Sequence, residues 1–349
     1  MDFGMFMEFG RRQGASDADA FREGFALVDA AESWGLDEAW LAELHLNPTR
    51  SVLSSPVMTA CSIATRTKRL RVGMAVYVLP LNHPLRIAEE AATIDQISEG
   101  RFDMGIGRSG FARAYDCYGI SYAESRDRFR EALDIILGAW KGEPFSYNGK
   151  YFHIDNATLS PLPYQKPHPP LRIAATTAES FPFIGAQGRP IFVGLRGMDI
   201  PELRRCLKEY RRAWKEAGHP GNGDAALRIP VYAGQTTAEA LEEPWESINA
   251  YFGRMGNLYR ESAGRAGIDA TELRQGRADR LAGLSYDQML ETKVAFGTGE
   301  ELVERFTQLK EDLGLDNVVA ELNAGGLIPA DRVMRSLKIL THQVMPEFK

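Results

Sequence analysis

Three glycines and one arginine form the clearest chemical motif of the sequence. Gly105, Gly107 and Gly110 have the G-x-G-x-x-G spacing that binds the pyrophosphate of a dinucleotide when a strand leads directly into a helix. Arg108 lies inside the motif, and its guanidinium could pair with a phosphate. The motif therefore has two interpretations, the turn of an NAD-dependent dehydrogenase or a strand end that binds another ligand.

The residues that follow the glycines favour the second interpretation. A dinucleotide-binding helix begins at the third glycine, so that its N-terminus faces the pyrophosphate. Here Ser121 and Glu124 have capping-box spacing, which predicts that the helix begins about ten residues later. The glycines would instead let a planar ligand approach the backbone closely, with Arg108 beside it. The alternative for Arg108 is a surface position on a flexible loop.

Short apolar strands alternate with amphipathic helices along nearly the whole chain and must position this motif. Eight strands are expected, at DFGMFMEF, DEAWLAEL, RLRVGMAVYVLP, RFDMGIG, LRIAAT, RPIFVGL, RIPVYAG and NVVAEL. Eight strand–helix units favour an α/β fold of the (β/α)8 TIM-barrel type, in one domain spanning residues 1–349. A doubly wound sheet is the alternative.

Two stretches interrupt this alternation. Residues 141–170 are rich in proline and aromatic residues and contain Asn148-Gly149, which predicts a hairpin before the fifth strand. Residues 251–296 lack clear strand character and follow the seventh strand. Long insertions at this place are often lids, so residues 251–296 are a candidate lid.

Composition narrows the classes of function. The 349 residues carry a formal net charge of −6, which argues against nucleic acid as a partner because phosphate backbones require a basic face. Cys61, Cys117 and Cys206 have no CxxC spacing, so we expect neither a metal site nor disulfides, and a cytoplasmic location. No signal peptide is expected, and no apolar run approaches the roughly 20 residues of a membrane span.

Four segments carry a resemblance to a known family. They are WGLDEAWLAELH (34–45), VGMAVYVLPLNHPLRIAEEAATIDQISEGRFDMGIGRSG (72–110), RIAATTAES (172–180) and RSLKILTHQVMPEF (335–348). Their order and spacing resemble the bacterial luciferase superfamily of flavin-dependent monooxygenases. The resemblance implies a TIM barrel, FMN supplied in reduced form by a separate flavin reductase, O2, and a small, fairly apolar substrate. It also implies a homodimer formed through the helices after strands two and three.

The resemblance also implies a set of flavin-binding residues. They are Ala75, Val76, Gly107, Arg108, Thr176, Thr177 and Ser180. Ala75 and Val76 would lie beneath the flavin ring and be joined by a cis peptide bond. Arg108, Thr177 and Ser180 would bind the flavin phosphate, near a helix expected to begin around Ala178. Gly107 replaces a cysteine of luciferase, so light emission is not implied. Thr176 stands where luciferase has a glutamate, so a contact of Thr176 with the flavin ring is not implied.

Glu43 and His45 are the candidate catalytic residues that the resemblance implies. Luciferase has two adjacent histidines after the matching glutamate, and the first of them is catalytic, whereas this chain has Leu44 there and retains only His45. A hydrogen-bond acceptor at the barrel end and a structural histidine are the alternative roles. Glu321 and Asn323, after the last strand, are expected to face the same site.

Two alternative functions share the expected fold. A deazaflavin-dependent oxidoreductase would transfer hydride without oxygen. A noncatalytic subunit resembling the luciferase β chain would explain the missing histidine. It would not explain why Arg108, Thr177 and Ser180 are retained, because a subunit that binds no flavin needs no phosphate site.

Overall fold

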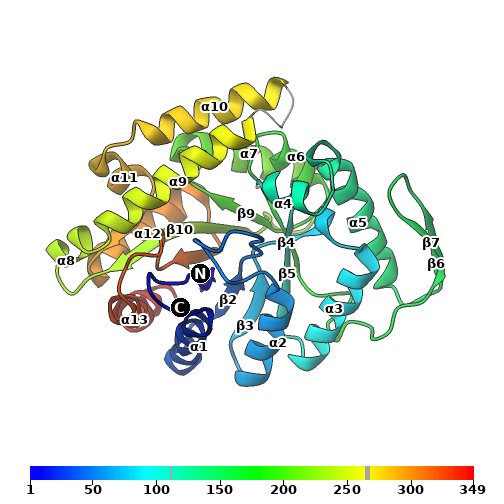
Figure 1. Ribbon diagram of the computed structural model, residues 1–349, viewed down its shortest axis with the longest axis horizontal. Coiled ribbons are helices and arrows are strands. Elements are labelled where there is room, and N and C mark those ends of the chain that lie inside the picture. Colours follow the sequence, from blue (N-terminus) through cyan, green and yellow to red (C-terminus); the bar gives the residue numbers. More distant parts are fainter. Residues whose placement is uncertain (111, 264–267) are drawn as a thin grey trace.

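Eight parallel strands close into a barrel within the residues that the computed structural model describes, which are 1–110, 112–263 and 268–349 (Figure 1). In chain order they are β1 (Asp2–Met7), β2 (Glu38–Leu41), β3 (Arg71–Met74), β5 (Phe102–Gly107), β8 (Leu171–Ala174), β9 (Ile191–Gly194), β10 (Ala225–Ala233) and β12 (Asn317–Glu321). Neighbours in this order pair with one another, and parallel pairing of β12 with β1 closes the ring. The predicted (β/α)8 barrel is confirmed, and the doubly wound sheet is wrong.

Helices cover the outside of this barrel (Figure 1). They are α1 (Asp17–Trp34), α2 (Pro56–Arg66), α3 (Pro84–Ile97), α5 (Ser125–Ala139), α6 (Ser180–Ala186), α7 (Ile200–Glu216), α12 (Gly299–Leu313) and α13 (Ala330–Ile339). After α13 the chain continues through η3 (Leu340–Val344) and η4 (Met345–Phe348), where the N-terminal amine donates to the Phe348 carbonyl at 3.0 Å. None of the helices in the described ranges is long and apolar enough to cross a bilayer.

Helix α1 shows how the local sequence sets these elements. Its first turn is held by a reciprocal capping box between Ser16 and Asp19, and it ends at Gly35, whose φ of 86° suits glycine. The residues that it buries against the barrel recur at helical spacing: Ala20, Gly24, Val28 and Ala31. The sequence therefore contains both the boundaries and the buried face of this helix.

The segment after β5 differs from expectation. A short helix, α4 (Ala112–Cys117), and a 3-10 turn, η2 (Tyr122–Glu124), occupy the residues between the glycines and the next helix, for which no element was expected. The predicted capping box is wrong, because the side chain of Ser121 makes no capping bond and Glu124 is paired with Arg128. Because the carboxylate of Glu124 pairs with Arg128, it does not bond to the backbone of Ser121. Helix α5 begins at Ser125 without a side-chain cap.

Both predicted interruptions of the barrel pattern are present. Strands β6 (Phe145–Asn148) and β7 (His153–Ala157) form the expected antiparallel hairpin, which Figure 1 shows at the side of the barrel next to α5. The insertion after β10 consists of α8 (Thr237–Glu242), α9 (Trp245–Ala263), α10 (Ile268–Ala282), α11 (Tyr286–Thr292) and β11 (Ala295–Gly297). Residues 264–267, part of the expected lid, lie outside the described residues. β11 is a short strand, paired with β10, that the sequence pattern did not predict.

The barrel interior is packed with aromatic rings. The indole of Trp40 fits between two strand glycines, because a Cβ would lie 2.8 Å from this ring at Gly4 and 2.3 Å from it at Gly73. Its ring meets Phe192 edge to face, with centroids 4.7 Å apart. This layer fills the centre of the barrel and leaves ligands only its two ends.

Candidate functional site

The two predicted phosphate-binding segments lie at the same end of the barrel. Arg108 directly follows β5, and Thr177 and Ser180 follow β8. Strands β5 and β8 are parallel neighbours, with Ile106 opposite Ile173. Because parallel strands end at one rim of a barrel, the guanidinium and the two hydroxyls belong to one mouth.

The glycine motif shapes the backbone of this mouth. A Cβ at Gly107 would lie 2.6 Å from Cγ2 of Val76, and a Cβ at Gly105 would lie 1.9 Å from the carbonyl oxygen of Met74. Strand β5 can therefore lie against the 74–76 segment only because these positions lack side chains. The Ala75–Val76 peptide bond is cis, as the resemblance implied.

A small apolar surface faces the mouth from inside the barrel. Phe6, Trp40 and Phe192 form a buried cluster, and the partly buried Ala75 and Val76 pack against it. Their remaining exposed surface gives a flat ligand an apolar platform beside the end of β5.

Arg108 is half-buried and has no carboxylate partner among the described residues. Its Nη1 donates to the Ser125 hydroxyl at 3.3 Å. Burial lowers the pKa of Arg108, and the nearby cations Arg126 and Arg274 lower it further. A desolvated cation beside other cations is stabilised by an added anion.

Helix α10 of the insertion brings two more arginines to this region. Arg274 donates to the Tyr122 hydroxyl at 2.6 Å. Arg277 donates from Nη2 to the Thr176 carbonyl at 2.7 Å, whereas its buried Nε has no hydrogen-bond partner among the described residues. The predicted residue Thr176 thus contacts the insertion through its backbone, and its own side chain is exposed.

Thr177 and Ser180 form a compact turn of hydroxyl groups. Their oxygens lie 3.0 Å apart, and the Ser180 hydroxyl donates to the Thr177 carbonyl at 2.6 Å. Helix α6 begins at Ser180, two residues later than expected. Both side chains are half-buried, so the hydroxyls remain within reach of a ligand in the mouth.

The candidate catalytic residues Glu43 and His45 are in direct contact. Nε2 of His45 lies 2.6 Å from Oε1 of Glu43, and Nδ1 lies 3.2 Å from the Tyr118 hydroxyl. The other Glu43 oxygen accepts from the backbone N–H of Val78 at 2.7 Å. Glu43 therefore holds the chain just after the cis bond, while both nitrogens of His45 have partners.

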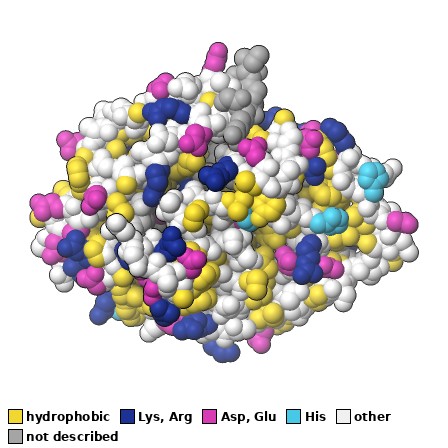
Figure 2. Space-filling model, in the orientation of Figure 1, with side chains coloured by type: hydrophobic (Ala, Val, Ile, Leu, Met, Phe, Trp, Pro, Cys, Tyr) yellow, Lys and Arg dark blue, Asp and Glu magenta, His cyan; other side chains and the backbone are white. Residues whose placement is uncertain are grey.

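A cavity of about 540 Å³ opens between these residues and helix α9. It is lined from the barrel by Glu43, His45, Val78 and Ser109, and from α9 by Tyr251, Arg254, Met255 and Leu258. On this side of the molecule, hydrophobic side chains gather near the centre with basic side chains beside them (Figure 2). The insertion thus forms one wall of the cavity.

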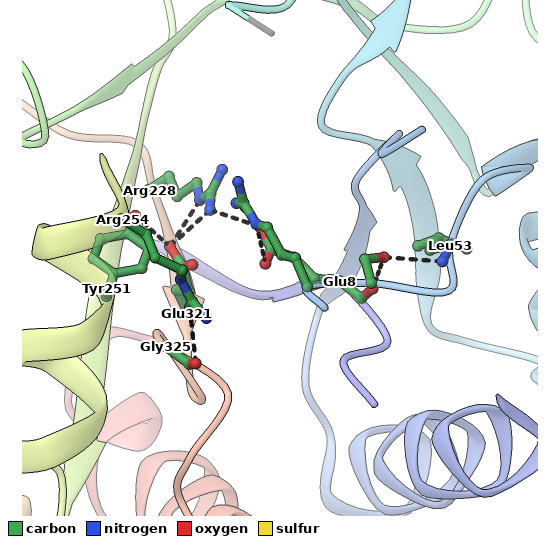
Figure 3. A network of polar contacts seen from close by, with 9 residues as sticks. Glu8, Leu53, Arg228, Tyr251, Arg254, Glu321 and Gly325 are labelled. Carbon is green, nitrogen blue, oxygen red and sulfur yellow. Dashed lines mark hydrogen bonds and ion pairs between the residues drawn. The ribbon is translucent and has the colours of Figure 1, made fainter. Parts of the chain in front are cut away.

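A polar network that the sequence reasoning missed lies beside the cavity (Figure 3). Arg50 forms a two-pronged ion pair with Glu8. Nη2 of Arg228 lies 2.8 Å from Glu321, and the Tyr251 hydroxyl donates to the same Glu321 oxygen at 3.2 Å. Two features of the sequence could have indicated this network: Glu8 stands at the end of an apolar strand, and Arg228 stands within one.

Glu321 and Asn323, near the end of the last strand, were both expected to face the site, and one of them does. Glu321 faces the mouth and joins this network. The side chain of Asn323 accepts from the backbone N–H of Ile328 at 3.0 Å, so Asn323 holds its own loop instead.

The residues of the mouth fit a planar group with an anionic tail. An apolar platform lies at Val76, and the tail would find Arg108 and the two hydroxyls at the ends of β5 and β8, with Arg277 of α10 bound to the neighbouring Thr176 carbonyl. Charge-assisted hydrogen bonds from guanidinium and hydroxyl groups are the usual means of binding phosphate.

The model of the family described as luciferase-like monooxygenase matches residues 1–317. The chain is 24% identical over 362 residues to the oxygenase component of flavin-dependent trigonelline monooxygenase from Acinetobacter baylyi, covering 100% of this chain and 96% of that protein.

Two solved structures share the fold. The oxygenating constituent of 3,6-diketocamphane monooxygenase from Pseudomonas putida, in complex with FMN, has a TM-score of 0.82 and 23% identity, covering 99% of this chain and 98% of that one. The coenzyme F420-dependent tetrahydromethanopterin reductase from Methanopyrus kandleri has a TM-score of 0.74 and 21% identity, covering 100% and 99%.

Proposed function

From the premise that the chain belongs to the luciferase-like monooxygenase family and is a flavin-dependent monooxygenase, we propose that it is the oxygenase component of a two-component system. It would take reduced FMN from a separate reductase and use O2 to oxygenate a small organic substrate. One observation supports the choice of FMN. Arg108, which has no carboxylate partner among the described residues, lies at the same rim of the barrel as the hydroxyls of Thr177 and Ser180.

The compared proteins support this proposal. The trigonelline enzyme is named as a flavin-dependent oxygenase component, which implies a partner that supplies reduced flavin. The diketocamphane enzyme was solved with FMN on the same fold. Both descriptions agree with a mouth that offers one compact phosphate site and an apolar platform.

Each residue of the mouth has a proposed role in holding FMN. Arg108, Thr177 and Ser180 would bind the phosphate, and Thr176 would link that turn to α10 through Arg277. The flavin ring would rest on Ala75 and Val76, close to the backbone of Gly107. Bound reduced FMN supplies the oxygen-activating chemistry, and the protein orients the cofactor and excludes water.

Glu43 and His45 would act on the other side of the cavity. Glu43 positions the backbone at Val78 and is therefore a positioning residue for the platform. His45 lines the cavity between Glu43 and Tyr118, so it is the group placed to hold or pass a proton at Nε2 or Nδ1. The 251–296 insertion would exclude water from this space as a lid.

A homodimer is part of the same proposal. Helices α2 and α3 would form the interface. Met58 on α2 has 72% of its surface exposed in the single chain, so this apolar side chain is available for burial against a second copy. Light scattering of the wild type and of Met58→Asp tests this: the variant is expected to be monomeric, and a monomeric wild type contradicts it.

A deazaflavin cofactor is the second candidate, because the F420-dependent reductase has the same barrel over its full length. Titration of the protein with reduced FMN, riboflavin and reduced F420 separates the candidates. We expect micromolar or tighter binding of reduced FMN only, and tighter binding of F420 would overturn the choice of cofactor.

The variant Arg108→Gln tests the phosphate site itself. It should weaken binding of reduced FMN by about 1.5–3 kcal/mol, roughly 10-fold to 150-fold, and leave binding of riboflavin unaffected because riboflavin has no phosphate. The matched control is Arg130→Gln, on the exposed face of helix α5. Equal FMN affinity of Arg108→Gln and the wild type contradicts the assignment.

A further inference from the structure

The part of the mouth opposite Arg108 contains more cations than anions. Among the described residues, four arginines gather there around two carboxylates, and Figure 3 shows most of this group. The arginines are Arg50, Arg196, Arg228 and Arg254, and the carboxylates are Glu8 and Glu321.

Two of these arginines occupy the available carboxylates. Glu8 accepts two bonds from Arg50 and lies 3.5 Å from Nη2 of Arg228. Glu321 accepts from Nε and Nη2 of Arg228 and from the hydroxyl of Tyr251. The network therefore has little acceptor capacity left for further cations.

Arg254 and Arg196 remain without a carboxylate partner among the described residues. Arg254 donates from Nη2 to the Gly325 carbonyl at 2.8 Å, and it lines the cavity from helix α9. Arg196 follows β9 and makes no hydrogen bond to any described residue. Both side chains are half-buried, so they reach accessible space from within the protein.

Electrostatics places both arginines around the same groups. Arg254 and Arg196 each interact with Glu8, Glu321 and Tyr251, and for Arg196 these neighbours raise the pKa although burial opposes them. Burial lowers the pKa of Arg254, and neighbouring Arg50 lowers it further. Such a cation is stabilised by an anion that enters the cavity.

We propose that the substrate is a small organic carboxylate whose anionic group is bound by Arg254, which lines the cavity, and is attracted by Arg196, which lies near the same two carboxylates. This inference rests on the proposed function and names its substrate class. The apolar body would lie against the hydrophobic residues of the same cavity, which are Leu44, Leu81, Met255 and Leu258. A volume of about 540 Å³ accommodates an aromatic or alicyclic acid.

This anion site is distinct from the proposed flavin phosphate site. Around the closed barrel, β12, which carries Glu321, is four strands away from β5, which carries Arg108. Glu321, and Arg254 through its bond to Gly325, therefore lie across the mouth from Arg108, whereas Arg196 follows β9, between the two sites. The apolar platform at Val76 lies beside β5. One mouth can thus hold a cofactor phosphate and a substrate carboxylate at the same time.

Matched acid and amide probes test the proposal on the full-length protein. Benzoate against benzamide, and cyclohexanecarboxylate against its amide, are titrated calorimetrically with and without FMN. We expect the acids to bind at least 10-fold more tightly than their amides. Equal binding of acids and amides would overturn the proposal.

Variants test which arginines cause the preference for acids over amides. Arg254→Gln should reduce the acid preference at least 10-fold, whereas Arg260→Gln, on the exposed face of the same helix, should keep it. Arg196→Gln breaks no hydrogen bond to the described residues and should also weaken acid binding. An acid preference that survives both Arg254→Gln and Arg196→Gln contradicts the site.

FMN affinity separates this proposal from the cofactor assignment. Arg254→Gln should bind reduced FMN as the wild type does, and Arg108→Gln should keep the acid preference. If Arg254→Gln weakens FMN but not riboflavin, the surplus arginines bind the flavin phosphate and the substrate proposal is overturned. An acid preference without O2 consumption from reduced FMN would leave the anion site standing and reject the monooxygenase role.

Discussion

Arg71 and Arg172, at the end of the barrel where the strands begin, are each paired with a carboxylate, whereas Arg108 and Arg254, at the end where the strands finish, have none among the described residues. Arg71 lies 2.6 and 2.9 Å from the oxygens of Asp103. Arg172 lies 2.7 Å from each oxygen of Asp224. These two arginines of the strand-start end are thus paired with carboxylates, whereas Arg108 and Arg254 at the other end have no such partner in the described part of the chain.

The difference teaches that an arginine's role depends on its partners more than on its burial. Two-pronged pairs fix the strand ends and neutralise the charge that would attract an anionic ligand. Unpaired guanidiniums carry a desolvation cost that a ligand can offset. We therefore assign stability to the paired end, which we call the floor, and ligand binding to the mouth.

Breaking a floor pair is expected to have the largest effect. Arg172→Met keeps most of the side-chain volume but removes the partner of Asp224 and the counter-charge of buried Asp103. We expect a loss of about 3 kcal/mol in the free energy of unfolding, measured with urea. A loss below about 0.5 kcal/mol would remove the distinction between the two ends.

Glu38 gives the floor a pH dependence. Burial, with help from Asp103, raises the pKa of Glu38 to about 7 from an ordinary 4.5, although the indole N–H of Trp40 donates to it at 2.7 Å. The folded state therefore binds this proton more tightly than the unfolded state. Its favourable contribution is complete below about pH 4.5 and is lost as the pH rises to about 7.

Glu38→Gln should abolish this dependence. The free energy of unfolding of the variant, relative to that of the wild type, should be about 2–3 kcal/mol higher at pH 8 than at pH 4.5, because the amide stays neutral and can still accept from Trp40. Unfolding curves at the two pH values measure it. An equal difference in the free energy of unfolding between variant and wild type at both pH values would show that the pKa of Glu38 is not raised.

At the mouth, removing one hydroxyl should have the smallest effect. Thr177→Val keeps the shape of the side chain and removes one donor from the turn with Ser180. We expect reduced FMN to bind about 5-fold more weakly, or about 1 kcal/mol, with unfolding changed by less than about 0.5 kcal/mol. A variant that loses stability but binds FMN normally would assign Thr177 to the fold.

The sequence was sufficient for most of the fold because its signals are local. Apolar runs marked all eight barrel strands, and the ends of α1 depend on its own neighbouring residues Ser16, Asp19 and Gly35. The failures were also local: Glu124 had a competing partner in Arg128, and α4 was too short to show a periodic pattern.

The site could be predicted only where a resemblance supplied it. Arg108, Thr177 and Ser180 were identified in this way, and the structure brings them to one rim. Arg254 was not identified from the sequence. It lies on a helix of the insertion, and the position of this helix over the mouth depends on long-range packing that no local pattern encodes. Whether a guanidinium is paired depends on three-dimensional neighbours, and the sequence alone does not state them.

The most direct test compares one arginine from each end in the same two assays. Unfolding free energy and reduced-FMN affinity are measured for Arg172→Met and Arg108→Gln. We predict that Arg172→Met loses about 3 kcal/mol of stability and binds FMN normally when folded, while Arg108→Gln keeps its stability and binds FMN at least 10-fold more weakly. If Arg108→Gln instead loses stability and keeps its FMN affinity, the division between floor and mouth is wrong.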